Sequence, residues 1–198
     1  MDAYSTLNTA PKNSEPYGWL ACPDEYQLPE QLRPRVPEQG SLRILGYYEE
    51  GDLERMAPFI GPIFGDPEYG VLTLAEREFI GVVISAVNCC VTCLLIHTDK
   101  LGELIGDHGR ARRLSINYRT VSLSAEERAI ADFCIKVTER PGRLEQADVQ
   151  VLRDVGLSDA KIYYVVQTAA AFNFTNRMTS AFGMRPDDDF LARLAPRS

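Results

Sequence analysis

Residues 73–101 read TLAEREFIGVVISAVNCCVTCLLIHTDKL and bring four reactive side chains into one short stretch. These are a carboxylate, two thiols and an imidazole: Glu78, Cys90, Cys93 and His97. Eleven residues separate the glutamate from the first of these cysteines, two separate the cysteines, and three precede the histidine. The apolar residues around them predict two helical segments. We therefore expect this stretch to hold both the centre of the fold and a reactive site.

A helix through the thiols would place Cys90, Cys93 and His97 on one face. At about 3.6 residues per turn, the seven positions from Cys90 to His97 advance roughly 700°, and Cys93 lies one turn before His97. Asn88 is the expected N-cap, which would put Cys90 in the first turn beside N–H groups without helical partners. A thiol pKa falls at a helix N-terminus or beside a protonated histidine. The spacing thus predicts an activated thiolate.

The Cys-x-x-Cys spacing also suits redox chemistry. One helical turn brings two Cβ atoms near the ~3.8 Å separation of a disulfide, so Cys90 and Cys93 can cycle between dithiol and disulfide. His97 is placed to accept a thiol proton, as in other thiol–imidazole nucleophiles. Glu78 is placed to orient or recharge the imidazole. Together the four residues predict a proton relay.

Two less reactive interpretations fit some of the same residues. Cysteine is among the residue types most often buried, so Cys89, Cys90 and Cys93 could each be small core side chains in an apolar run. Cysteine and histidine are also zinc ligands, but a structural zinc site usually draws on two separated ligand pairs, and no second pair is present. The joint spacing favours an active site, and we predict no metal and no bound cofactor.

The E-x11-C-x2-C-x3-H spacing resembles the signature of the AhpD-like branch of the carboxymuconolactone decarboxylase superfamily. Further along, SLSAEERAIADFCIKVTERP, ADVQVLRDVGLSD and QTAAAFNFTNRM are similar to the helical C-terminal part of its peroxidase-related members. The resemblance extends over residues 42–182. It implies an all-α, AhpD-like helical bundle that assembles into a homo-oligomer, whether dimer, trimer or hexamer.

The resemblance also implies a role for each of the four residues. Cys93 would attack a hydroperoxide and become a sulfenic acid, and Cys90 would resolve it as a disulfide. Glu78 and His97 would relay protons, and an external dithiol or redox partner protein would reduce the disulfide. AhpD itself has a second histidine between its cysteines, where this chain has Thr92. The relay is therefore expected to be shorter, or suited to another substrate.

Two other functions stay open. Superfamily members without the dithiol are similar in architecture yet decarboxylate or isomerise small organic acids and lactones, and fold analogy alone does not separate these reactions. A non-enzymatic redox adaptor or sensor would instead report oxidation to another protein. A peroxidase needs both sulfurs, whereas a decarboxylase or isomerase should tolerate their loss. The role of Cys89, next to Cys90, also stays open.

Composition bears on the partners and the location. The 198 residues carry 21 Lys plus Arg against 28 Asp plus Glu, a net charge of −7, and form no basic patch that would favour nucleic acid. The first residues lack the basic and apolar segments of a secretory signal, and no run of 18 apolar residues predicts a membrane span. Five cysteines, an odd number, do not suit a secreted disulfide framework and favour a reducing, cytoplasmic location.

The chain is expected to begin with a Pro-rich arm, residues 1–40, followed by one helical domain, residues 41–198. Six prolines in the arm forbid a long regular element, and four aromatic residues suggest packing against the domain or a neighbouring subunit. In the domain, capping boxes and apolar spacing predict the helices. Their expected ranges are 52–64, 74–87, 89–104, 124–137, 147–155 and 159–182, with Gly156 as a C-cap.

Two weaker features complete the pattern. The polar stretch 106–122 is expected to be a solvated surface, whose His108 and arginines could also meet an anionic substrate or partner. An internal repeat is visible when residues 74–93 are laid over residues 157–176. The alignment pairs Cys93 with Asn176, so the second copy would keep a helical hairpin and lose the chemistry.

Overall fold

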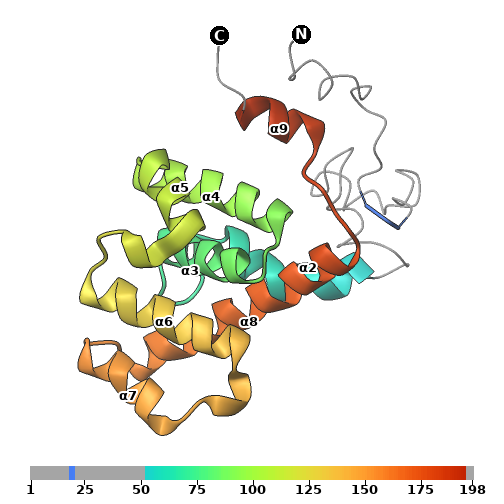
Figure 1. Ribbon diagram of the computed structural model, residues 1–198. Helices are drawn as coiled ribbons and strands as arrows, with labels where there is room; N and C mark the ends of the chain where they lie inside the picture. The colour runs from blue at the N-terminus through green and yellow to red at the C-terminus, as the bar shows by residue number, and fades with distance from the viewer. Residues whose placement is uncertain (1–17, 21–51, 195–198) are drawn as a thin grey trace.

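The structure is a computed structural model that describes residues 18–20 and 52–194 (Figure 1). These residues fold into α-helices and short 3-10 turns without any β-strand, which confirms the all-α class. The predicted arm lies outside the described residues except for residues 18–20, and so does the start of the predicted domain, residues 41–51. Among the described helices, none has the length and apolar character needed to span a membrane.

Helix α3 (Leu74–Val87) is the central element of the bundle. Its residues 77–85 are all buried, which is typical of a helix covered on every side. Figure 1 shows α3 in the middle, with α4 (Val91–Ile105) and α5 (His108–Asn117) above it, and α6 (Ala125–Glu139) and α8 (Asp159–Ala181) below. The reactive stretch therefore forms the core of the fold, as its apolar composition predicts.

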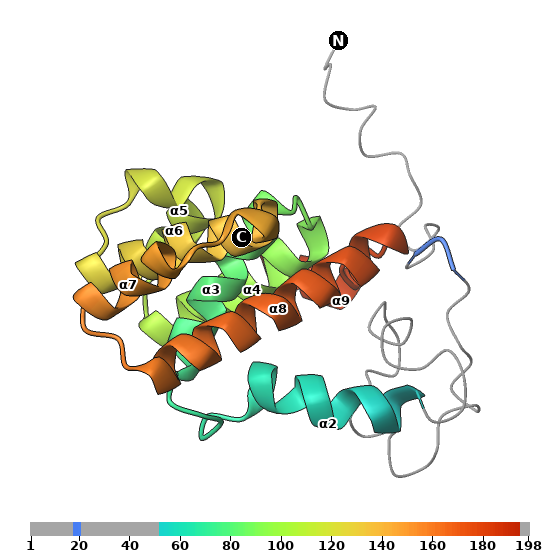
Figure 2. The same ribbon diagram turned by 90° about the horizontal axis from the view of Figure 1, so that it is seen from below.

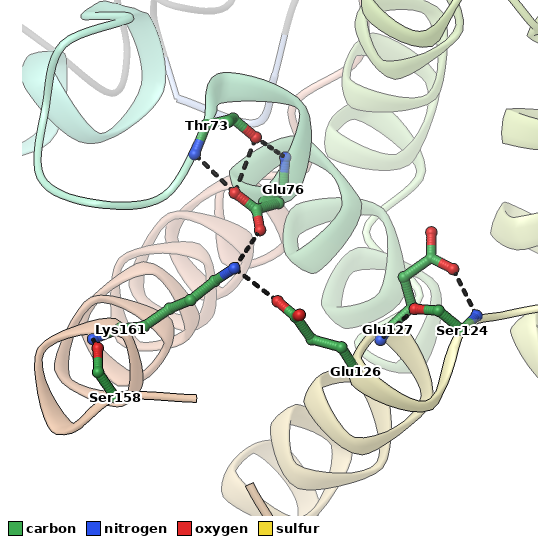
Figure 3. Close-up of polar contacts among 7 residues, drawn as sticks. All are labelled: Thr73, Glu76, Ser124, Glu126, Glu127, Ser158 and Lys161. Carbon is green, nitrogen blue, oxygen red and sulfur yellow. Dashed lines mark hydrogen bonds and ion pairs between the residues drawn. The ribbon is translucent and has the colours of Figure 1, made fainter. Parts of the chain in front are cut away.

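Local capping signals set where α3 and α6 begin. The Thr73 hydroxyl accepts from the N–H of Glu76 at 3.2 Å, and the Glu76 carboxylate accepts from the N–H of Thr73 at 2.7 Å. Ser124 and Glu127 repeat this reciprocal pair at 3.0 and 2.8 Å (Figure 3). Both capping boxes predicted from the sequence are confirmed, because each depends only on residues three positions apart.

One lysine joins three helices at the start of α8. Lys161 Nζ lies 2.6 Å from Glu76 Oε1 of α3 and also pairs with Glu126 Oε1 of α6 (Figure 3). Burial opposes ionisation of Glu76, but Lys161 and the Thr73 cap hold the pKa of that carboxyl below its usual range. The three side chains are partly exposed, so each pair contributes at most about 1 kcal/mol. The cluster orients helices and lies apart from the thiols.

The polar stretch 106–122 contains a helix that its pattern does not indicate. Asp107 caps α5 by accepting from the N–H of Arg110 at 2.7 Å. Only Ala111 and Leu114 of this helix are buried, so its apolar stripe is too narrow to be recognised in the sequence. The Arg110 guanidinium pairs with Glu127 at 3.0 Å, which gives this arginine a structural role.

The remaining helices frame the bundle. Helix α2 (Asp52–Gly65) continues through both of its prolines and lies at the edge of the bundle next to α8 (Figure 2). Helices α7 (Gln146–Asp154) and α9 (Asp188–Leu194) are short. The predicted cap at Gly156 needs a small correction: Val155 is the C-cap, and Gly156 follows it with a φ of 100°. Glycine is favoured there because a left-handed residue ends the helix.

Candidate active site

The turn between α3 and α4 positions the two thiols. Asn88 is the C-cap of α3, and Cys90 is the N-cap of α4 with φ −79° and ψ 92°. The prediction that Asn88 caps the second helix is therefore wrong, and Cys90 precedes the first turn while Cys93 lies in it. The reason is a tertiary contact: the Asn88 amide donates to Asn173 and Asn176 of α8, each at 3.1 Å.

Cys89 gives the turn its sharp reversal. It is the one non-glycine residue with positive φ among the described residues, at 52°. Its side chain is exposed, with the sulfur 3.9 Å from the Val87 carbonyl oxygen, whereas Cys90 and Cys93 are only 1% and 7% exposed. Cys89 therefore differs in its surroundings from the two sulfurs beside it.

The two buried sulfurs form a hydrogen-bonded pair. The side chain of Cys93 is the largest cause that lowers the pKa of the Cys90 thiol, to about 6, and it outweighs burial, which acts in the opposite direction. The backbone N–H of Cys93, the Ser180 hydroxyl and the charged form of His97 lower the pKa further. The contact with Cys90 raises the pKa of Cys93, and burial adds to this effect. The anion is thus favoured on Cys90 and the proton on Cys93.

Helix α8 supplies polar groups that the sequence motif does not include. Ser180 contacts Cys90, while Thr179 and Asn176 hydrogen-bond Cys93 and oppose the rise of its pKa. The Asn176 amide is held in place because it donates to the Ser85 hydroxyl at 3.2 Å. The one sequence signal that points to Asn176 is the internal alignment, which pairs this residue with Cys93.

Glu78 is an acid enclosed between two basic side chains. Its Oε2 lies 2.6 Å from His97 Nδ1 and its Oε1 lies 2.8 Å from Lys100 Nζ, although the carboxylate is 1% exposed. Burial opposes ionisation, but the hydrogen bond and charge of His97, followed by Lys100, hold the pKa of Glu78 below its usual range. Because Nδ1 faces the carboxylate, Nε2 is the ring nitrogen left to exchange a proton.

Two aromatic rings fix the orientation of the imidazole. Phe172 of α8 meets the His97 ring edge to face, with centroids 4.7 Å apart, and Phe64 of α2 lies at 5.8 Å. The two phenyl rings also contact each other at 4.7 Å. Helices distant in sequence thus pack two apolar rings against the histidine, whose side chain is 15% exposed.

Lys100 is a residue that the sequence interpretation missed. It lies three positions after His97, so the helical spacing that groups the cysteines with the histidine also places Lys100 on the same face. Thr92 occupies the position at which the sequence departs from AhpD, and its hydroxyl donates to the Met184 carbonyl at 2.6 Å.

The structure brings the predicted residues together as two contacting pairs, Glu78 with His97 and Cys90 with Cys93. The two pairs interact electrostatically, because the charge of His97 lowers the pKa of Cys90. The chemical roles assigned to them stay predictions. His108 is not part of this group and lies 3.6 Å from Asp99. Within the described part of the chain, no group of three or more His, Cys, Asp or Glu side chains could hold a metal ion.

Comparison with solved structures identifies proteins of the same architecture. An uncharacterised peroxidase-related protein from Silicibacter sp. TM1040 is 27% identical, with a TM-score of 0.79, and the match covers 91% of this chain and 97% of that one. An alkylhydroperoxidase AhpD core protein, uncharacterised and peroxidase-related, from Ralstonia eutropha JMP134 is 26% identical, with a TM-score of 0.75 over 93% and 100% of the chains.

A third neighbour carries a different activity. The debrominase Bmp8, solved as a cysteine-to-alanine variant in complex with 2,3,4-tribromopyrrole, is 17% identical with a TM-score of 0.61, and the match covers 83% of this chain and 90% of that one. At this identity the likeness establishes the fold alone. No protein-family model matches the chain, and no curated protein matches its sequence.

Proposed function

From the premise that the structural neighbours of this chain are AhpD-like peroxidase-related proteins, consistent with the AhpD-like superfamily, we propose that it is a hydroperoxide reductase. One observation carries the proposal: two buried, hydrogen-bonded sulfurs, with the pKa of Cys90 lowered to about 6, lie near the partly exposed His97, which pairs with the buried Glu78. A thiolate at neutral pH and a base next to it are what thiol-dependent peroxide reduction requires.

The proposed reaction has two steps. The thiolate attacks the terminal oxygen of a hydroperoxide, so that an S–O bond forms, the O–O bond breaks, and the alkoxide leaves as an alcohol after taking a proton. The second thiol then loses its proton and attacks the sulfenic sulfur, so that an S–S bond forms and water leaves. The sum is one hydroperoxide and one dithiol converted to an alcohol, a disulfide and water. An external dithiol, not a bound cofactor, restores the reduced protein.

The order of the two sulfurs is the point on which resemblance and electrostatics differ. The resemblance gives the first attack to Cys93. The charge distribution favours Cys90, because the thiolate is the reactive form and the proton is held by Cys93. We assign the first attack to Cys90, because it is the N-cap residue of α4 and its sulfur accepts a hydrogen bond from the backbone N–H of Cys93.

Single serine variants test both the function and this order. Cys90→Ser and Cys93→Ser should each abolish catalytic peroxide consumption with dithiothreitol as reductant, while Cys89→Ser should retain it. After one equivalent of cumene hydroperoxide, dimedone should label Cys90 in the Cys93→Ser variant. If dimedone labels Cys93 in the Cys90→Ser variant but does not label Cys90 in the Cys93→Ser variant, the order that the resemblance implies is restored. Unchanged turnover in either variant would reject the function.

The alternatives predict different outcomes. A decarboxylase or isomerase of a small acid or lactone should keep its activity in the Cys90→Ser, Cys93→Ser double variant. A redox adaptor or sensor should form the disulfide reversibly yet show negligible turnover with any small dithiol. Because a neighbour with this fold is a debrominase, 2,3,4-tribromopyrrole belongs among the compounds assayed. If both sulfurs are needed to consume this compound, the dithiol reduces a substrate other than a peroxide.

We also propose a cytoplasmic homo-oligomer. The outward face of α8 carries the exposed apolar side chains Tyr163, Val166 and Phe174, a pattern that suits contact with another copy. Light scattering after size exclusion should give a multiple of the 22.1 kDa chain mass. Phe174→Glu should reduce it, and a monomeric mass for the unmodified protein would contradict this part of the proposal.

A further inference from the structure

We propose that Asn176 is a catalytic residue of disulfide formation, whose amide donates a hydrogen bond to the Cys93 sulfur when that sulfur becomes an anion. Asn88 is the positioning residue that turns this amide towards the sulfur. The proposal rests on the proposed function in one respect, the reaction in which the two buried sulfurs form a disulfide. Neither asparagine is among the four reactive residues that the sequence predicts.

Asn176 lies at a buried junction of three helices. The residue is 1% exposed, belongs to α8, and contacts Ser85 of α3 and Cys93 of α4. A buried amide needs partners for its two hydrogens and for its oxygen. The Asn176 nitrogen donates one hydrogen to the Ser85 hydroxyl at 3.2 Å, which leaves the second hydrogen for the sulfur. Cys93 is therefore one of the partners that satisfy this amide.

The orientation of the neighbouring amide, Asn173, is determined by groups that can only donate or only accept. The Arg177 guanidinium can only donate, and its nitrogen lies 2.5 Å from Asn173 Oδ1. The Ala169 carbonyl can only accept, and it lies 3.0 Å from Asn173 Nδ2. The atom of Asn88 that lies 3.1 Å from Asn173 Oδ1 must therefore be a donor, which is its amide nitrogen.

Asn88 in turn determines the orientation of Asn176. The Asn88 nitrogen carries two hydrogens, one donated to Asn173 Oδ1 and the other to Asn176 Oδ1, each at 3.1 Å. Because its oxygen is held by Asn88, Asn176 presents its NH2 group to Ser85 and Cys93. An NH2 group that faces a sulfur stabilises the thiolate, which agrees with the effect of Asn176 in lowering the pKa of Cys93.

This hydrogen bond becomes important after the first step of the reaction. While Cys90 is a thiolate, its contact with Cys93 is the largest cause that raises the pKa of Cys93, so the proton stays on that sulfur. Conversion of Cys90 to a sulfenic acid removes the negative charge. Burial still opposes ionisation of Cys93, while Thr179 and Asn176 donate hydrogen bonds that favour the anion. Asn176 thus favours ionisation of Cys93 when the second thiolate is needed.

The assisted step balances in atoms and electrons. Cys93 loses its proton, its sulfur forms a bond to the Cys90 sulfur, and the S–O bond of the sulfenic acid breaks. The departing hydroxide takes up a proton and leaves as water. Because the pKa of Cys93 is raised above its ordinary value, a larger thiolate fraction outweighs the small loss of nucleophilicity that a hydrogen bond causes. Loss of the donor should therefore slow this step.

The first test measures ionisation of Cys93 without any peroxide. In a Cys89→Ser, Cys90→Ser background, Cys93 is the one cysteine of the tryptic peptide 78–100, so mass spectrometry can follow its alkylation by iodoacetamide across a pH series. Asn176→Ala should raise the pKa of Cys93 and move the alkylation midpoint up by about one pH unit or more, the scale of one hydrogen bond to a charged group. An unchanged midpoint would overturn the proposal.

The matched control removes a hydrogen bond of the same cluster that does not reach the sulfur. The Asn173 amide donates to the Thr138 hydroxyl at 2.9 Å, and Ala169 keeps that amide in place when the hydroxyl is lost. Thr138→Val should therefore leave the alkylation midpoint of Cys93 unchanged. If Asn176→Ala does not fold, Asn176→Leu, which is closer in volume to asparagine, serves as the variant without a donor.

Asn88→Asp tests the positioning role without changing a group that contacts the sulfur. A carboxylate has no hydrogen to donate, so the Asn176 amide should rotate, donate to the carboxylate and turn its oxygen towards Cys93. The alkylation midpoint of Cys93 should rise. In a double-mutant cycle, Asn88→Asp should raise it less when Asn176→Ala is already present. Equal effects with and without Asn176 would mean that the added charge acts directly, and would overturn the role of Asn88.

A kinetic test identifies the step that the donor assists. After one equivalent of cumene hydroperoxide, Asn176→Ala should form the Cys90 sulfenic acid as fast as the parent protein. It should convert the sulfenic acid to the disulfide about tenfold more slowly, so dimedone should trap more of it. Thr138→Val should match the parent in both steps. A slower first step, or equal slowing of both steps with a lower Tm, would overturn the proposal.

The two proposals fail separately. If the protein consumes no hydroperoxide, the alkylation series still decides whether Asn176 stabilises the Cys93 thiolate. If peroxide turnover is found but Asn176→Ala changes neither the alkylation midpoint nor the yield of trapped sulfenic acid, the proposed function stands and the role of Asn176 is rejected.

Discussion

Glu78 Oε2 lies 2.6 Å from His97 Nδ1, and the carboxylate that makes this contact is almost completely buried. A buried anion persists only when it is paired, so its two basic partners are necessary for its charge.

Replacing Glu78 by Gln should lower peroxide turnover by about 100-fold, the usual scale of general acid–base catalysis. The amide keeps the shape of the side chain but removes the carboxylate that passes protons to and from His97. Initial rates at saturating peroxide measure the effect. Glu76→Gln is the matched control, because Glu76 pairs with Lys161 away from the thiols. It should keep full activity and lose at most about 1 kcal/mol of stability; equal losses of activity in both variants would argue against a relay.

The Cys90 thiol should react as a thiolate at unusually low pH. Its pKa is lowered from 9.0 to about 6, so the alkylation rate with iodoacetamide should rise through an inflection near that pH. The same group affects folding: the unfolded thiol binds its proton more tightly, so the reduced protein should gain stability as pH rises from about 6 to about 9. Ser180→Ala should move the alkylation curve to higher pH. An inflection near 9 in the unmodified protein would contradict the prediction.

Gly81→Ala should destabilise the bundle and disturb the site. A Cβ at this position would lie 2.1 Å from the Phe172 ring, which packs edge to face on His97. Overpacking of this kind typically costs about 1–3 kcal/mol, measured by urea unfolding. Gly61→Ala in α2 is the opposite control: no atom lies within 4 Å of its Cβ, so it should stabilise the protein by up to about 1 kcal/mol. Equal effects at the two glycines would exclude close packing as the cause.

Cys89 can be tested for backbone and thiol effects separately. Its left-handed conformation costs a residue with a side chain about 1 kcal/mol, so Cys89→Gly should be more stable than Cys89→Ala by about that amount. Thermal unfolding of the two variants, neither of which has the thiol, measures the difference. Both should retain peroxide turnover. A matching loss of turnover in the two variants would show that the sulfur of Cys89 takes part in the reaction.

The features that the sequence predicts well are those set by nearby residues. The starts of α3 and α6 follow from the reciprocal contacts of Thr73 with Glu76 and of Ser124 with Glu127. That Cys93 and His97 lie on one helix, α4, follows from the apolar pattern of the stretch. These inferences need no knowledge of the rest of the fold.

The features that the sequence does not predict depend on contacts between distant residues. Asparagine is a favoured N-cap residue, so Asn88 is expected to begin the second helix. Instead its amide donates to Asn173 and Asn176, more than 80 positions away, and Cys90 is the N-cap of α4. The hydroxyls of Thr179 and Ser180 reach the sulfurs from α8 for the same reason. Helix α5 is missed on other grounds, because two inward residues are too few to create a detectable period.

The break between α3 and α4 separates the two sulfurs into different kinds of structure, with Cys90 in a turn and Cys93 in a regular helix. If a disulfide forms between them, we expect the turn that carries Cys90 to move towards helix α4, which carries Cys93. This helix is already anchored, since Thr92 is fastened to Met184 beyond α8. The movement that accompanies oxidation and reduction should thus be confined to the turn between α3 and α4, while the rest of the bundle keeps its structure.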